Sequence, residues 1–186
     1  MKNYFSILFL FYFLFSNAQV QWSEESVLEF QKTINREYAS KTESPLMEED
    51  LKDFKTLDFY PINSKFAVEA QFVRTKNEKK FKMKTTGTRT PEYVKYGELH
   101  FEIDSKKFSL NVYQNIELIK KEGYEDYLFL PFSDLTCGKE SYIGGRYIDM
   151  RFPKSNTVLI DFNKAYNPYC AYNHKYSCPI VPLEND

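Results

Sequence analysis

Two stretches of the sequence combine the residue types that binding or catalysis requires. The first, residues 132–147, places three glycines among polar and charged side chains and ends in Gly144-Gly145-Arg146-Tyr147. Glycine lets the backbone approach a neighbouring group closely, and the planar guanidinium of arginine matches a carboxylate or a phosphate. This stretch is therefore predicted to hold a small anionic ligand through Asp134, Tyr142, Gly144, Gly145 and Arg146.

The second stretch, residues 161–169, follows a predicted strand and is rich in Asp, Asn and Tyr. Asp161, Asn163 and Tyr166 complete the predicted pocket if the two stretches converge. The alternative interpretation is structural. Gly144-Gly145 is then a turn, Arg146 pairs with Asp134 or Asp161, and the Asp and Asn side chains bond their own backbone.

Carboxylates also allow an enzymatic interpretation, with Asp134 or Asp161 as the general base of a hydrolase. This alternative requires one of the two to have a raised pKa inside a cleft. Glu98, His100 and Glu102 alternate along a predicted strand and share one face, which permits a titrating cluster. A solvated sheet face is the simpler explanation of their spacing.

Three cysteines occur, at positions 137, 170 and 178. In an exported protein, Cys170 and Cys178 are close enough in sequence to form a disulfide that staples an otherwise irregular segment. Two reduced thiols, or a metal site that includes His174, are the alternatives. A closed zinc site needs four ligands and no fourth Cys or His lies nearby, so neither a metal nor a cofactor is predicted. Cys137 is expected to be a passive free thiol.

The first 18 residues have the layout of a cleavable secretory signal. Lys2 is followed by an apolar run, and Ser16-Asn17-Ala18 places small residues before a cut at Gln19. We therefore predict export to the periplasm or the extracellular space. No later run is long enough to span a membrane. The formal charge of −1 gives no basic surplus for binding nucleic acid.

Periodicity divides the remaining 19–186 into helices at about 23–56, a β-rich part at 65–162 and an irregular tail at 163–186. Apolar spacing predicts a helix over 22–38 with Ser23 as its N-cap, and a second helix starting at Ser44-Pro45. Alternation of period two predicts strands at 65–73, 99–103, 108–113, 127–132, 146–152 and 157–162, and one exposed strand within 74–92. The predicted fold is mainly β (α+β): an antiparallel barrel-like or sandwich sheet with two N-terminal helices, in a single domain.

Several short motifs resemble the bacterial and archaeal "domain of unknown function 1684" family. They include Tyr96-Gly97-Glu98-Leu99, Asp161-Phe162-Asn163-Lys164-Ala165-Tyr166-Asn167-Pro168 and Tyr176-Ser177-Cys178-Pro179-Ile180. The resemblance runs from about residue 23 to the end and implies that Cys170 and Cys178 are signature positions. Cys137 and His174 lie outside the pattern. Because the family carries no assigned activity, the leading expectation stays an exported domain that binds a small anionic ligand. An enzyme and a structural or partner-binding envelope protein are the alternatives.

Overall fold

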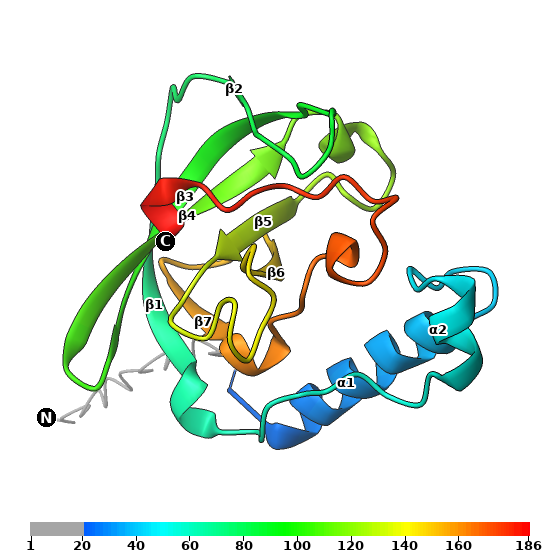
Figure 1. The fold of residues 1–186 in the computed structure, drawn as a ribbon. Helices are drawn as coiled ribbons and strands as arrows, with labels where there is room; N and C mark the ends of the chain where they lie inside the picture. Colours follow the sequence, from blue (N-terminus) through cyan, green and yellow to red (C-terminus); the bar gives the residue numbers. More distant parts are fainter. Residues whose placement is uncertain (1–20) are drawn as a thin grey trace, which may run out of the picture.

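The computed structural model describes residues 21–186 and shows an antiparallel half-barrel with two helices beside it (Figure 1). The main sheet has the order β6-β5-β4-β3-β1-β7, and β2 pairs with β3 outside this path. The predicted fold class is confirmed. The strands are β1 (Ala67–Arg74), β2 (Phe81–Lys82), β3 (Glu92–Ile103), β4 (Lys106–Asn115), β5 (Tyr127–Phe132), β6 (Arg146–Arg151) and β7 (Thr157–Asp161).

Strands β3 and β4 form the predicted hairpin, with a tighter turn than the sequence indicates. Ile103 pairs with Lys106, so the turn consists of Asp104 and Ser105 alone. Both have positive φ, at 50° and 60°. Two central residues with positive φ give a turn whose twist matches that of the flanking strands. Asp tolerates this conformation because its side chain is short and polar.

Strand β5 is buried on both of its faces, as its nearly continuous apolar sequence predicts. Leu128, Leu130 and Phe132 join a largely aliphatic core with residues of β1, β3, β4, β6 and β7. The alternate residues Tyr127 and Phe129 lie in a second, tyrosine-rich cluster. Because side chains alternate across a strand, these two clusters occupy opposite faces of the sheet. We call them the aliphatic face and the tyrosine face.

Helix α1 (Glu24–Ala39) begins as predicted, with Ser23 as its N-cap: the Ser23 side chain accepts from the Ser26 amide. Val27, Ile34 and Tyr38 form its buried face. Helix α2 (Glu48–Asp53) begins later than predicted, after Met47. The Ser44 hydroxyl donates instead to the Tyr38 carbonyl at 2.6 Å and accepts from the Leu46 amide at 3.2 Å. These bonds anchor the link to α1, so Ser44-Pro45 does not cap α2.

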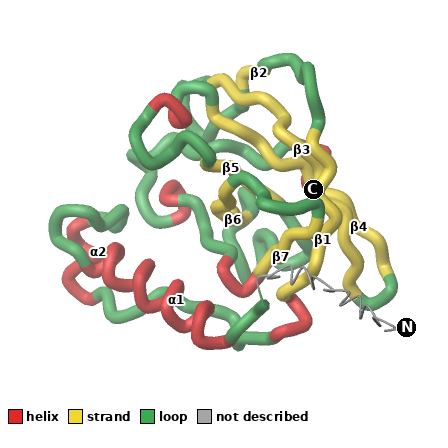
Figure 2. Tube along the Cα trace, turned by 180° about the vertical axis from the view of Figure 1, so that it is seen from behind, coloured by secondary structure: helices red, strands yellow, loops and turns green. Residues whose placement is uncertain are grey.

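The tail after β7 first runs between the helices and the sheet and then crosses the sheet on the side of β2 and β4 (Figures 1 and 2). It consists of short 3-10 turns at Phe162–Lys164, Tyr169–Ala171 and Leu183–Asn185 joined by irregular chain. Tyr166 pairs with Tyr147 of β6 through two backbone hydrogen bonds of 2.9 and 3.0 Å. This seam links the tail to the edge strand β6.

The predicted signal peptide lies outside the described residues. Within residues 21–186, no helix combines the length and the apolar composition needed to cross a membrane.

Candidate functional site

The structure brings parts of the two predicted stretches together, but Asp134, Tyr142, Gly144, Gly145 and Asp161 do not line the recess that they share. Arg146 at the start of β6 and Asn163 after β7 both line a small recess of about 70 Å³, which we call the arginine recess. Tyr166 also borders it. The full lining is Leu57, Asp58, Phe59, Tyr60, Glu140, Ser141, Arg146, Phe162, Asn163, Ala165, Tyr166, Asn167 and Tyr172.

Arg146 is already paired. Its Nη2 lies 2.5 Å from Oδ2 of Asp134, and the arginine side chain is only 12% exposed. Oδ1 of Asp134 accepts from the Thr136 amide at 2.9 Å and from its hydroxyl at 2.5 Å. Burial raises the pKa of Asp134, but the Thr136 hydrogen bonds and the Arg146 charge outweigh it and lower that pKa overall. The pairing of Arg146 with Asp134 matches the structural alternative.

The two glycines serve packing between neighbouring segments. A Cβ on Gly144 would lie 2.6 Å from the ring of Tyr142. Gly145 has φ of +86°, and a Cβ there would lie 2.6 Å from the carbonyl oxygen of Phe132. Its amide donates to the Tyr142 carbonyl at 3.1 Å, so this donor does not face a pocket. The glycines are therefore explained by close approach of the backbone rather than by a ligand cradle.

Asp161 is a buried turn former. Its Oδ1 accepts from the Asn163 amide at 3.1 Å and from the Asn163 side chain at 2.7 Å. Its Oδ2 is buried and has no hydrogen-bond partner among the described residues. Because both Asp134 and Asp161 are held by local hydrogen bonds in turns, this geometry argues against either one as the general base of a hydrolase.

The three cysteines are all free thiols in the structure. The predicted Cys170–Cys178 bridge is not formed, although the two residues are in contact: the Cys170 amide donates to the Cys178 sulfur at 3.2 Å. Cys170 Sγ lies 3.6 Å from the Tyr142 hydroxyl. Burial raises the pKa of Cys178 to about 11, which keeps the thiol protonated at neutral pH. Within residues 21–186 no three His, Cys, Asp or Glu side chains gather as a metal site, so the metal alternative for this segment gains no support.

Glu98 and His100 lie on the side of β3 that faces solvent, as the simpler interpretation predicts. Glu98 accepts from Lys95 at 2.5 Å, and Nε2 of the half-exposed His100 lies 3.1 Å from it. The Lys95 hydrogen bond is the main reason that the pKa of Glu98 is lowered.

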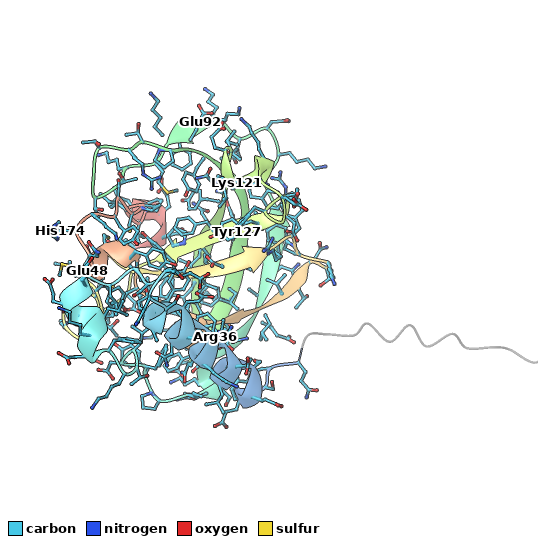
Figure 3. All side chains as sticks on the ribbon, turned by 90° about the vertical axis from the view of Figure 1, so that its right-hand side faces the viewer. Arg36, Glu48, Glu92, Lys121, Tyr127 and His174 are labelled. Atoms are coloured by element: carbon cyan, nitrogen blue, oxygen red, sulfur yellow. The ribbon has the colours of Figure 1, made fainter. Side chains whose placement is uncertain are left out.

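A second cavity, larger than the arginine recess, was not predicted from the sequence. It measures about 410 Å³ and lies against the tyrosine face of β5 and β6, between the sheet, α1 and the tail. We call it the aromatic cavity. Its lining is Phe30, Thr33, Ile34, Glu37, Tyr93, Leu118, Tyr127, Phe129, Tyr147, Asp149, Tyr166, Pro168, Tyr169, Cys178 and Pro179. In Figure 3, Tyr127 marks this side of the sheet, with α1 and its Arg36 below.

Asp149 is the carboxylate around which the cavity's polar groups are organised. The hydroxyls of Tyr127 and Tyr166 each donate to its Oδ1 at 2.7 Å. Burial, reinforced by the negative charge of Asp149, raises the pKa of both tyrosines. They consequently remain hydrogen-bond donors throughout the physiological pH range. Tyr147 extends its hydroxyl to the carbonyl of Pro179 in the tail, which ties the cavity wall to the tail.

A signal for this cavity is present in the sequence. Tyr127 and Phe129 alternate with the aliphatic residues of β5, and Tyr147 and Asp149 do so in β6. Two adjacent strands that present aromatic rings on the face opposite the aliphatic core indicate a second covered surface. The tail covers this surface, and its apolar residues have neither helical nor strand spacing. The covering segment could therefore not be recognised from periodicity.

Comparison with known proteins agrees with the family that the sequence motifs indicate. The model of the family described as "Protein of unknown function (DUF1684)" matches residues 52–186. The chain belongs to this family. The fold of this DUF1684 protein is similar to the solution NMR structure of the uncharacterised protein from gene locus rrnAC0354 of Haloarcula marismortui. The two chains are 28% identical, and the match has a TM-score of 0.68 and covers 87% of each. None of the curated proteins compared with the chain matches it.

Proposed function

We propose that this DUF1684 protein is a small-molecule-binding domain whose ligand occupies the aromatic cavity. The volume of about 410 Å³ carries the proposal, because small-molecule pockets in proteins fall in the range of roughly 300–1,000 Å³. The lining supports it as well: aromatic and apolar side chains predominate, and a few convergent polar groups around Asp149 can orient a ligand. The expected ligand is a compact organic molecule with at least one ring or branched apolar group.

The test is to fill the cavity from α1. Thr33 lines the cavity, so Thr33→Phe places a ring inside it. Lys32→Phe adds the same ring on the exposed side of the same helix, where Lys32 is 75% exposed. Binding of 2-phenylethanol is followed by NMR shifts of the tyrosine rings. We expect Thr33→Phe to weaken binding at least tenfold and Lys32→Phe to leave it unchanged. No binding of this alcohol or of its ammonium analogue to the wild type, or equal binding to all three proteins, would overturn the proposal.

A second candidate is the anionic ligand predicted for the arginine recess. One observation favours it: Nε of Arg146 is buried and has no hydrogen-bond partner among the described residues. A recess of about 70 Å³ has room for a group the size of phosphate or acetate. The existing pair with Asp134 limits the free positive charge. If Arg146→Ala leaves the thermal shifts induced by phosphate and acetate unchanged, this candidate fails.

We further infer that the protein is exported after removal of residues 1–18, with the mature chain starting at Gln19. Lys2, the apolar run that follows it and the small residues Ser16 and Ala18 before Gln19 support the inference. The intact mass of the full-length product, expressed in a Gram-negative host and recovered from the periplasm, tests it. Recovery of the uncleaved chain from the cytoplasm would contradict it.

A further inference from the structure

We propose that the aromatic cavity selects an organic cation, an alkyl- or arylammonium ion whose charged end lies against Asp149. This inference rests on the function proposed above and specifies the class of ligand. It follows from three features of the lining: the sign of its charges, the number of its rings and the arrangement of hydrogen bonds on Asp149.

The charged residues that line the cavity are both acidic. They are Glu37 on α1 and Asp149 on β6, and none of the lining residues is Lys or Arg. Two arginines lie nearby. Arg151 donates to Asp126 at 2.7 Å and to the Gly123 carbonyl at 2.6 Å. Arg89, whose charge acts on Tyr93 and Cys178, donates to the Ser177 carbonyl at 2.7 Å. Among the lining side chains, a cationic ligand would thus meet only opposite charges and an anionic ligand only like charges.

The rings supply a second source of attraction. Seven of the fifteen lining residues are aromatic, and they come from α1, β3, β5, β6 and the tail. The face of an aromatic ring carries partial negative charge and attracts an ammonium group. A cavity with rings on several sides is the arrangement that recognises quaternary and alkyl ammonium ions.

The hydrogen bonds on Asp149 leave one of its oxygens for a ligand. Tyr127 and Tyr166 both donate to Oδ1. Oδ2 accepts no hydrogen bond from the described residues. The two tyrosines therefore fix the orientation of the carboxylate, while Oδ2 can accept from an ammonium N–H. A neutral alcohol can donate its O–H to the same oxygen but brings no opposite charge, and a carboxylate ligand has no donor to offer it.

The experiment compares three probes of one skeleton: phenethylammonium, 2-phenylethanol and phenylacetate. Dissociation constants are measured by calorimetry at neutral pH for the wild type, Asp149→Asn and Glu102→Gln, an exposed carboxylate on β3 that serves as control. We expect the ammonium probe to bind at least tenfold more tightly than the alcohol, and phenylacetate to bind most weakly. Asp149→Asn should reduce the preference for the ammonium probe to less than threefold, while Glu102→Gln retains it.

The outcomes separate this inference from the function on which it rests. If the alcohol and the ammonium probe bind equally well and Thr33→Phe blocks both, the cavity binds small molecules but does not select cations. If Asp149→Asn keeps the preference, the selection does not depend on Asp149, and the inference that the charged end lies against this carboxylate is overturned. If none of the three probes binds, the proposed function itself fails. Retention of the wild-type unfolding transition by Asp149→Asn excludes misfolding as the cause of a lost preference.

Discussion

The side-chain amide of Asn185 bonds to both backbone groups of Asn111, as the backbone of a neighbouring strand would. Oδ1 of Asn185 accepts from the Asn111 amide at 2.8 Å, and Nδ2 of Asn185 donates to the Asn111 carbonyl at 2.9 Å. The same Nδ2 donates to the carbonyl of Pro131 in β5 at 2.6 Å. Strands β4 and β5 share a single direct residue pair, Tyr113 with Phe129, so this buried amide joins them where their own ladder is missing.

Replacing Asn185 should therefore destabilise the sheet. Asn185→Ala leaves one backbone donor and two backbone acceptors without their partner, and we expect a loss of roughly 2–4 kcal/mol in the free energy of unfolding. Urea denaturation measures this loss. Glu184→Ala, at the exposed neighbouring position, is the control and should change stability by less than about 0.5 kcal/mol. Equal urea midpoints for the two variants would show that the amide contributes nothing.

Gly145 and Gly123 form a matched pair for separating steric contact from backbone strain. Both have positive φ, at +86° and +80°. A Cβ at Gly123 meets nothing within 4 Å, whereas one at Gly145 lies 2.5 Å from Val181. Gly123→Ala should cost about 1–2 kcal/mol from conformation alone. Gly145→Ala should cost clearly more, at least about 3 kcal/mol, because overpacking is added. Similar thermal shifts for both variants would contradict the close approach.

The Asp134–Arg146 pair should give the protein an acid-dependent contribution to stability. The folded state lowers the pKa of Asp134 below its ordinary 3.8, so the unfolded chain binds the proton more readily. The contribution is thus present above pH 3.8 and is lost as the pH falls through the folded-state pKa. The Asp134 side chain is 37% exposed, so the contribution of the pair to the free energy of unfolding at neutral pH should be only about 1 kcal/mol.

Denaturation of the wild type and of Asp134→Asn from pH 7 down to pH 2 measures this effect. The difference between their free energies of unfolding should be constant near neutrality and shrink towards the acid end. A difference that does not vary with pH would rule out the ionised Asp134 as its source.

The Cys170 amide donates to the Cys178 sulfur at 3.2 Å, so we propose that an added disulfide oxidant such as oxidised glutathione, which takes up the two hydrogens, bridges the two cysteines. The bridged protein should be two hydrogens lighter than the reduced form, a mass difference of about 2 Da. Cys170→Ser and Cys178→Ser should each abolish this change, and Cys137→Ser should not. Because the pKa of Cys178 is raised to about 11, its thiolate is scarce at neutral pH, and bridging that starts from Cys178 should accelerate as the pH rises. A mass loss that persists in Cys178→Ser would indicate a different pairing.

The sequence predicted the seven strands of the described residues because their spacing reports which side of the sheet each residue faces, although it began β3 at Leu99 rather than at Glu92. It also predicted that residues 132–147 and 161–169 meet, through the turns that follow β5 and β7. It placed the start of α2 too early, because Ser44 has the residue type of a cap but bonds backward to Tyr38. It could not predict the aromatic cavity, since part of the wall comes from tail residues such as Tyr166 and Cys178, whose positions depend on tertiary contacts rather than on periodicity.

The seam between Tyr147 and Tyr166 has a practical consequence. Two backbone hydrogen bonds at a strand edge can open locally at a free energy far below that of global unfolding. The amide protons of these two tyrosines should therefore exchange with heavy water sooner than those inside the β3–β4 ladder. Both residues border the aromatic cavity, so an occupant that contacts both would slow that exchange. Isotope uptake at these two positions then offers a way to search cell extracts for the natural occupant before its chemistry is known.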